Sequence, residues 1–203
     1  MKKLILSVAV VLGFGFSQAN AQKVSLGFKT EANVSNFILT DLDNLESNLK
    51  AGVTLGGFAK VDLCKHFAIQ PELLFNYKTS ESKALGLIST YEFWSAEIPV
   101  YAIGQWSLCD KGRIYVGVGP YVGMGLKGKI TETNTDLFKK NSNDESMLNR
   151  LDFGVGGTLG YELNCGLQIN AGYKIGLIDA LDAGKDNATM LPSTISLGLG
   201  YRF

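Results

Sequence analysis

The chain has 203 residues, of which 19 are basic, 19 acidic, 24 glycine, three cysteine and one histidine. This length suits one domain, and the balanced charge gives no basic surplus that would indicate a nucleic-acid partner. Its Gly and Pro residues follow no repeat typical of collagen or of a linker.

Residues 1–21 carry the three parts of a secretory signal peptide. Lys2 and Lys3 are basic, residues 4–16 are apolar, and Ala19-Asn20-Ala21 is a small-x-small cleavage site. The apolar run is too short to span a bilayer, and no later run approaches about 20 apolar residues. The sequence therefore predicts cleavage before Gln22, export from the cytoplasm and no helical membrane span.

Eight later segments alternate large apolar residues with small or charged ones, the pattern of a strand with two different faces. In chain order they are 23–33, 51–63, 67–79, 91–106, 113–127, 150–163, 167–178 and 195–203. Short turns at 64–66, 107–112 and 164–166 alternate with long connections at 34–50, 80–90, 128–149 and 179–191. Outer-membrane barrels have this arrangement, with the short turns in the periplasm.

Alternation alone does not say which face meets lipid, because a soluble barrel such as a lipocalin puts its apolar face inside. Two observations favour lipid outside. Charge and glycine gather on one face, which suits a narrow filled lumen. Trp94 and Trp106 share the other face twelve residues apart, or roughly 30 Å along the membrane normal at about 3.3 Å per residue and a tilt near 40°.

An outer-membrane apolar band is about 25 Å tall and has aromatic girdles at both edges. The sequence therefore predicts an all-β, eight-stranded antiparallel up-and-down transmembrane barrel over 22–203, in the bacterial outer membrane. The expected girdle residues are Phe67, Tyr77, Trp94, Trp106, Tyr201 and Phe203.

The inward face is expected to carry a network of six basic and six acidic residues that plugs the lumen. Its members are Lys29, Glu31, Lys60, Asp62, Glu72, Lys78, Glu97, Lys127, Asp152, Glu162, Lys174 and Arg202. Glu72 and Glu97 lie on adjacent strands at similar depth, so a general acid/base pair is the alternative to a structural role. Because basic residues match the acidic ones in number, we expect the structural role.

Other candidate sites are weak. His66 lies beside Cys64 in a short exposed turn, which offers neither burial nor an oxyanion hole for catalysis. No His and Cys spacing fits a metal, and the acidic residues of 41–46 lack the glycine and spacing of an EF-hand. We therefore expect no catalytic residue, no metal and no cofactor.

Cys64, Cys109 and Cys165 each fall in a different short turn. The compartment permits disulfides, but an odd number leaves at least one thiol free or bonded to another chain.

Four segments resemble the PorT-like outer-membrane β-barrel family, and the resemblance spans Gln22 to Phe203. They are Gln70-Pro71-Glu72-Leu73-Leu74-Phe75-Asn76-Tyr77-Lys78, Ala96-Glu97-Ile98-Pro99-Val100, Gly117-Val118-Gly119-Pro120-Tyr121 and Asp152-Phe153-Gly154-Val155-Gly156-Gly157. The resemblance implies an outer-membrane barrel but no single activity, since some relatives serve protein secretion. Many members have Lys where this chain has Gln70, so a salt-bridge partner there is not carried over.

The terminal Phe203 resembles the signal by which outer-membrane barrels are recognised for assembly. The expected partners are outer-membrane lipid, the barrel assembly machinery through the C-terminal strand, and an envelope protein. We expect a monomer with a structural or surface-interaction role through its extracellular loops. The alternatives are a narrow pore for small solutes, a subunit of a secretion or envelope assembly, and a lipid-modifying barrel enzyme.

Overall fold

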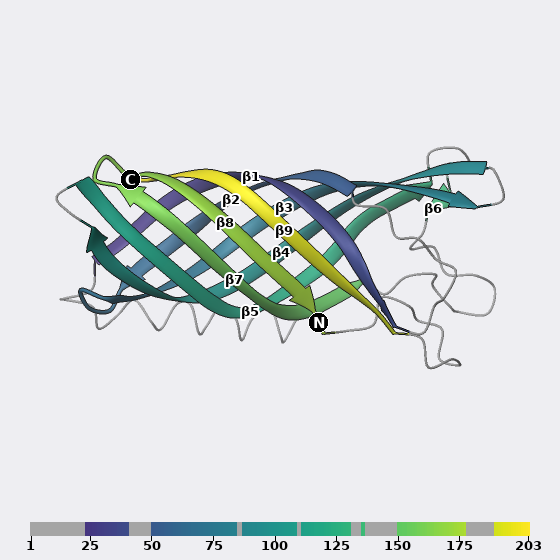
Figure 1. Ribbon diagram of the computed structural model, residues 1–203. Coiled ribbons are helices and arrows are strands. Elements are labelled where there is room, and N and C mark those ends of the chain that lie inside the picture. The colour runs from purple at the N-terminus through teal and green to yellow at the C-terminus, as the bar shows by residue number, and fades with distance from the viewer. Residues whose placement is uncertain are drawn as a thin grey trace.

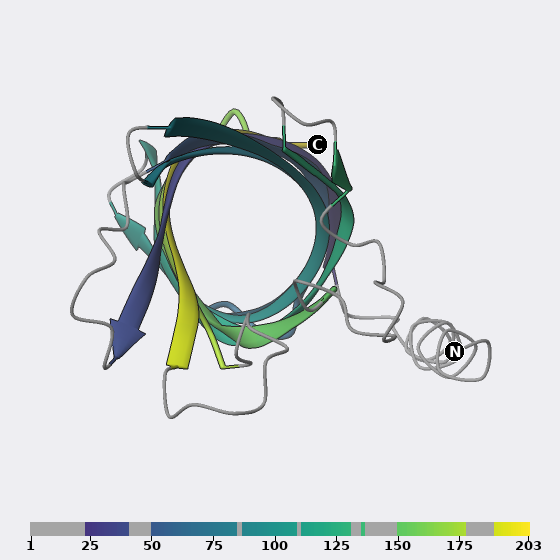
Figure 2. The same cartoon turned by 90° about the vertical axis from the view of Figure 1, so that its right-hand side faces the viewer.

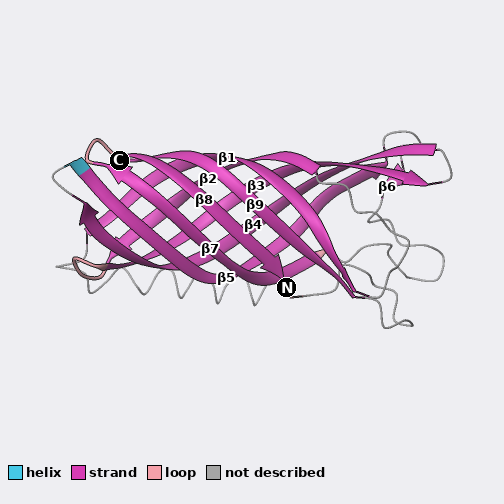
Figure 3. Ribbon diagram, in the orientation of Figure 1, coloured by secondary structure: helices cyan, strands magenta, loops and turns pink. Residues whose placement is uncertain are grey.

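The computed structural model describes residues 23–40, 50–84, 87–108, 111–130, 135–136, 150–177 and 189–203. The predicted signal peptide, Cys109 and most of the connections 34–50, 128–149 and 179–191 lie outside the described residues. Nearly all of the described chain is β-strand (Figure 3). Within it, no helix has the length and apolar character needed to cross a bilayer.

Eight long antiparallel strands and one short strand make up the fold (Figure 1). They are β1 (Lys23–Thr40), β2 (Lys50–Asp62), β3 (Phe67–Ala84), β4 (Leu87–Leu108), β5 (Gly112–Ile130), β6 (Thr135–Asp136), β7 (Leu151–Leu163), β8 (Leu167–Gly176) and β9 (Thr189–Arg202). The order β4-β3-β2-β1-β9-β8-β7-β5 closes on itself through an additional β4–β5 pairing. β6 lies outside this ring and pairs only with the end of β5.

The view along the axis shows the resulting closed ring (Figure 2). Closure leaves no free sheet edge in the wall, which a chain in lipid requires because nothing there can hydrogen-bond an exposed backbone group. The prediction of a closed eight-stranded antiparallel barrel is therefore confirmed.

The two ends of the barrel differ. The end that carries the connections 63–66, 109–111 and 164–166 is called the turn end here, and the opposite end the loop end. Gly166 shows how tight the turns are: its φ is 93°, which a residue without Cβ adopts without strain. Its amide donates to the Leu163 carbonyl at 2.9 Å, and its carbonyl accepts from the Arg202 amide at 2.9 Å.

The two faces of the wall are also opposite in chemistry. Leu197 and Leu26 point outward and are 65% and 60% exposed, while Lys60 points inward and is 1% exposed. A soluble barrel would have the reverse arrangement. The predicted assignment of the apolar face to the outside is confirmed.

Several strands run further toward the loop end than predicted. β1 continues to Thr40, β3 and β4 form a hairpin through most of 80–90, and β9 begins at Thr189 rather than 195. The paired residues Ser80–Tyr91 and Ala84–Leu87 belong to this extension, which projects beyond the barrel wall at the right of Figure 1. In these segments the apolar residues come in runs, such as Phe37-Ile38-Leu39, or are missing, as in 80–83, so the sequence lacks the alternation that marks a strand although the backbone ladder continues.

One irregularity changes which residues face inward. Trp94 pairs with Lys127 and Ser95 pairs with Gly125, so Leu126 is an extra residue in β5. Such a β-bulge shifts the alternation by one residue beyond it. Leu126 and Lys127 are both exposed as a result, and Gly128 is the next buried position.

The polar interior as the candidate functional site

The inward side chains form three groups that follow one another from the turn end to the loop end. Each is named by its central residue: the Glu162, Lys29 and Glu97 groups. Alternation along every strand places these side chains inside. Some of their partners lie on the same or a neighbouring strand, and others, as in the pairs Lys29–Glu72 and Arg202–Glu162, lie on strands that are not neighbours in the sheet.

The Glu162 group lies nearest the turn end and places three cations around one buried carboxylate. Oε1 of Glu162 lies 2.6 Å from the NH2 of Arg113 and 2.7 Å from the NH2 of Arg202. The Nε atoms of the two guanidinium groups donate to the same oxygen at 3.0 and 2.7 Å. Oε2 accepts from Gln168 at 2.8 Å and lies 3.6 Å from the Nζ of Lys60.

A second layer of hydrogen bonds holds the two arginines. The NH1 of Arg113 donates to Gln105 at 3.2 Å, and Gln105 donates in turn to Asp62 at 2.9 Å. The NH1 of Arg202 donates to the Ser25 hydroxyl at 3.1 Å. The group therefore joins side chains of all eight long strands except β3.

The Lys29 group lies deeper in the barrel and has the opposite balance of charge. The Nζ of Lys29 lies 2.9 Å from Glu31 and 2.7 Å from Glu72, so one cation serves two buried carboxylates. Two side-chain amides also hydrogen-bond these carboxylates: Gln70 donates to Glu72 at 2.8 Å, and Asn170 donates to Glu31 at 2.7 Å.

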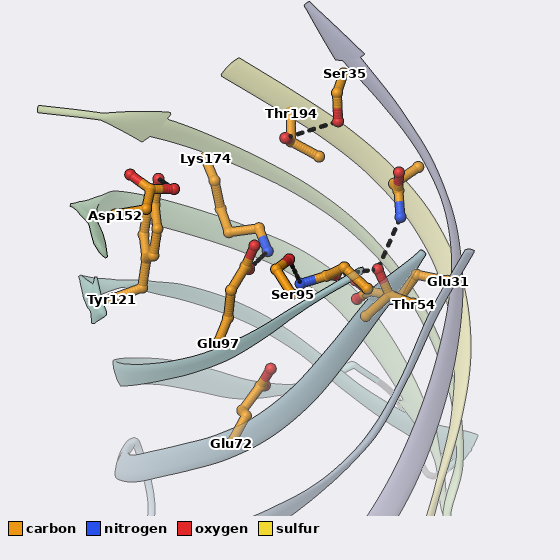
Figure 4. Close-up of polar contacts among 12 residues, drawn as sticks. Glu31, Ser35, Thr54, Glu72, Ser95, Glu97, Tyr121, Asp152, Lys174 and Thr194 are labelled. Carbon is orange, nitrogen blue, oxygen red and sulfur yellow. Dashed lines mark hydrogen bonds and ion pairs between the residues drawn. The ribbon is translucent and has the colours of Figure 1, made fainter. Parts of the chain in front are cut away.

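The Glu97 group lies nearer the loop end (Figure 4). Lys174 forms an ion pair with Oε2 of Glu97, and the Nζ of Lys78 lies 3.9 Å from Oε1. In the same group, the Tyr121 hydroxyl donates to Asp152 at 3.0 Å. Two cations and two carboxylates make this group neutral in formal charge.

Beside the Glu97 group, four uncharged side chains form a chain of hydrogen bonds across four neighbouring strands (Figure 4). Asn33 donates to Thr54 at 2.8 Å, Thr54 donates to Asn76 at 2.6 Å, and Asn76 donates to Ser95 at 3.4 Å. These residues come from β1, β2, β3 and β4 in that order, so each strand is linked to the next inside the lumen as well as in the wall.

Buried aromatic rings lie among these polar groups in the lumen. Tyr101 and Tyr115 pack with Ala68 and Ile103 in an apolar cluster within the lumen. The Nζ of Lys60 lies 5.4 Å from the centre of the Tyr115 ring, within the range of a cation–π contact. These buried side chains lie within the ring of strands that Figure 2 shows in cartoon form.

The structure places every predicted network residue on the inward face except Lys127. The bulge at Leu126 turns Lys127 outward, opposite Trp94, so its predicted place in the network is wrong. Arg113 is an inward cation that was not predicted from the sequence. With Arg113 in place of Lys127, six inward cations still match six inward carboxylates. Arg113 lies two residues before buried Tyr115 on the same strand, so the alternation along β5 could have identified it as an inward residue.

Glu72 and Glu97 belong to different groups rather than forming one carboxylate pair. Glu72 is held by Lys29 and Gln70, and Glu97 by Lys174 and Lys78. A proline lies close to each carboxylate in sequence: Pro71 precedes Glu72, and Pro99 is two residues beyond Glu97. The β3–β4 ladder has no assigned pair between Pro71–Val100 and Leu74–Glu97, because proline provides no amide hydrogen for a sheet.

The six predicted girdle residues all lie on the outer wall, where each is exposed or half-exposed. At the loop end, the Tyr77 and Trp94 rings are 4.8 Å apart. At the turn end, Tyr201 and Phe203 are 5.5 Å apart and both contact Phe28, which the sequence analysis did not include. The other two predicted residues, Phe67 and Trp106, are 60% and 49% exposed.

The remaining candidates lie at the turn end. Cys64 and Cys165 are exposed and form no disulfide, while Cys109 lies outside the described residues. His66 is exposed, and its backbone carbonyl accepts from the Gln105 amide at 2.8 Å. Within the described parts of the chain, no three His, Cys, Asp or Glu side chains are grouped so that they could hold a metal ion.

Residues 16–182 match the family described as outer membrane protein beta-barrel domain. No curated protein matches the chain in sequence. Among solved structures, Neisserial surface protein A is 12% identical with a TM-score of 0.55, over 89% of this chain and 99% of that one. This likeness, at low identity, shows the fold alone.

Two further structures are similar at lower TM-scores. The attachment invasion locus protein Ail of Yersinia pestis is 15% identical with a TM-score of 0.47, over 90% of this chain and 98% of its own. OprG from Pseudomonas aeruginosa is 14% identical with a TM-score of 0.49, over 88% of this chain and 96% of its own.

Proposed function

Because the chain belongs to the outer membrane protein beta-barrel domain family, and so to the bacterial outer membrane, we propose that it is a plugged, non-catalytic barrel that acts through its projecting loop end. Its role in this proposal is structural or one of contact with other molecules at the cell surface. The observation that carries the proposal is the filling of the lumen by ion pairs that cross it.

The three groups leave little room for a permeating solute. An eight-stranded barrel has an interior just wide enough for side chains to fill. Here Glu72 and Glu97 are each bound by a lysine, and the buried rings of Tyr101 and Tyr115 also lie in the lumen. Opening a path would separate buried charges from their partners, which costs several kcal/mol per unpaired ion. These contacts support a plugged barrel over a narrow pore.

The β3–β4 hairpin supports a role in surface contact. β3 continues seven residues past Tyr77, and β4 begins seven residues before Trp94. At about 3.3 Å per residue, the hairpin extends roughly 20 Å beyond this aromatic pair along the strand direction. If Tyr77 and Trp94 mark the edge of the apolar band, the hairpin stands in the external medium, where a partner can reach it.

We also propose that the chain is a member of the PorT-like family of outer-membrane barrels. Two of the motifs that carry the resemblance contain Glu72 and Glu97, and each motif places a proline next to a lumen ion pair. A role as a subunit of an envelope assembly agrees with both the plugged lumen and the projecting hairpin.

A planar bilayer experiment tests the plug. On this proposal purified monomer should give no steady conductance, because the ion pairs that cross the lumen block the passage of ions. A stable, ion-selective current from the native protein would overturn the plugged barrel and favour the pore.

Shortening the hairpin tests the surface role. Ser80 pairs with Tyr91, so replacing 81–90 by Asn-Gly closes β3 and β4 with a two-residue hairpin turn. Mild crosslinking in outer membranes should yield a reproducible partner with the native chain and lose it with the shortened one. Lys111→Ala at the turn end is the matched control and should retain the partner.

Heat-modifiable migration of both variants on gels confirms that each barrel is folded. Equal capture by native and shortened chains, with both folded, would contradict a role for the hairpin.

A further inference from the structure

A polar cavity of about 280 Å³ opens in the lumen at the turn end. Its lining includes the charged side chains of Lys23, Asp62, Arg113, Glu162 and Arg202. These residues come from β1, β2, β5, β7 and β9, so closure of the barrel brings them together. In an outer-membrane barrel the short turns face the periplasm, and the cavity is therefore accessible from that compartment.

The cavity carries more positive than negative charge. Its lining contains three cations, Lys23, Arg113 and Arg202, and two carboxylates, Asp62 and Glu162. A fourth cation, buried Lys60, lies on the other side of Glu162. Asp62 is bound by the amide of Gln105. Two guanidinium groups thus share one oxygen of one carboxylate, and the surplus of cations favours an additional anion at this end of the lumen.

The two arginines of the cavity, Arg113 and Arg202, also have N–H groups available for a further hydrogen bond. A guanidinium group has five N–H bonds in a planar fork. Arg113 uses its Nε, NH1 and NH2 atoms once each, on Glu162 and Gln105. Arg202 does the same on Glu162 and Ser25. Two N–H bonds on each group remain beyond these contacts with the described residues.

We propose that the turn-end cavity binds a phosphate-type oxyanion from the periplasm through Lys23, Arg113 and Arg202. Guanidinium forks match the oxygens of phosphate, and Lys23 adds a mobile charge at the rim. The volume lies just below the range of about 300–1,000 Å³ typical of small-molecule sites. It suits a phosphate group with a few waters, either free or as the end of a small monoester, rather than a whole lipid.

Titration calorimetry on the full barrel, refolded in zwitterionic detergent, tests the site with inorganic phosphate and with glycerol 3-phosphate. Both ligands are compared with sodium chloride at the same ionic strength. We expect saturable binding of at least one phosphate compound and none of chloride. Tighter binding of the inorganic ion identifies free phosphate as the ligand, and tighter binding of the ester identifies a phosphorylated compound.

Lys23→Gln removes one cation from the exposed rim of the cavity and should weaken phosphate binding by about fivefold. Lys65→Gln is the matched control, because Lys65 is also exposed at the turn end but does not line the cavity. Arg113→Lys keeps the charge and loses the fork, so it should weaken binding in the folded protein.

Three results would overturn the proposal: no saturable binding of either phosphate compound, equal binding of chloride, or equal losses from Lys23→Gln and Lys65→Gln. The last would show that any turn-end lysine attracts the anion through general charge. Because Lys23 lies on the exposed rim, its variant decides the question even where Arg113→Lys fails to fold.

Discussion

Lys29 on β1 and Glu72 on β3 form an ion pair of 2.7 Å inside the barrel, although β2 separates their strands in the wall. The same holds for Arg202 and Glu162, which reach past β8. Such contacts link strands that share no backbone hydrogen bonds. The side chains in the lumen therefore connect the strands in addition to the backbone ladder, and single substitutions among them should affect the stability of the whole barrel.

Glu162→Gln should be among the most destabilising single changes in the lumen. It leaves Lys60, Arg113 and Arg202 without their shared carboxylate, and breaking a buried ion pair from one side costs about 3–5 kcal/mol. Urea unfolding in lipid vesicles measures the loss. Glu92→Gln on the half-buried rim of β4 is the control and should change the unfolding free energy by less than about 1 kcal/mol.

Glu97→Gln should lower the unfolding free energy by roughly 1–3 kcal/mol without opening a channel. The change strands Lys174 and Lys78, but the residues of the other two groups still fill the lumen. Unfolding and planar bilayer recordings on the same preparation measure both effects. Adding Lys174→Met should recover part of the stability, because the stranded charge is then removed; a double variant as unstable as the sum of the two single ones would argue against this pairing.

Lys127 and Lys174 should behave differently although the sequence assigns both to the lumen. Lys174→Gln leaves Glu97 with one distant cation and should cost about 3 kcal/mol. Lys127→Gln on the exposed outer face should stay within about 0.5 kcal/mol of the native protein. Equal losses in urea unfolding would mean that β5 has no bulge at Leu126.

Two glycines of β7 give a test of the packing inside the lumen. A Cβ on Gly160 would overlap the ring of Tyr115, whereas a Cβ on Gly157 would have as its nearest neighbour the Gly117 carbonyl oxygen at 3.7 Å. Gly160→Ala should therefore lower the unfolding free energy by about 1–3 kcal/mol. Gly157→Ala should be neutral or slightly stabilising, and a matching loss at both positions would count against the filled interior.

Thiol labelling of intact cells tests the orientation in the membrane. Cys64 and Cys165 are exposed at the turn end, so an impermeant maleimide should reach them only after the outer membrane is permeabilised. A Cys109→Ser background removes the third thiol. Ser82→Cys, on the projecting hairpin of a cysteine-free variant, should react on intact cells; the opposite pattern would mean an inverted barrel.

The inward face could be predicted from the sequence because alternation has a period of two. Parity alone places Glu31, Glu72, Glu97 and Lys174 inside, and they are inside. Lys127 shows the limit of this reasoning, since one extra residue at Leu126 reverses the parity and leaves no mark in the residue types.

The extent of the strands was harder to predict than their number. In 34–40 the apolar residues Phe37, Ile38 and Leu39 are consecutive, and 80–83 are all polar, so no alternation marks the strand in either segment. These residues pair nonetheless. The sequence also could not predict which cation pairs with which carboxylate. The pairing of Arg202 with Glu162, or of Asn170 with Glu31, depends on how far the strands are staggered around the ring.

The position of Glu162 has a consequence for how the barrel assembles. Its partners lie on β2, β5, β8 and β9, so the carboxylate has all of its counter-charges only when the last strand has joined the first. An incomplete barrel in lipid would hold a buried acid beside too few cations, at a cost of several kcal/mol. Half-built intermediates are disfavoured for this reason, and insertion should be a cooperative, all-or-none event rather than a gradual addition of hairpins.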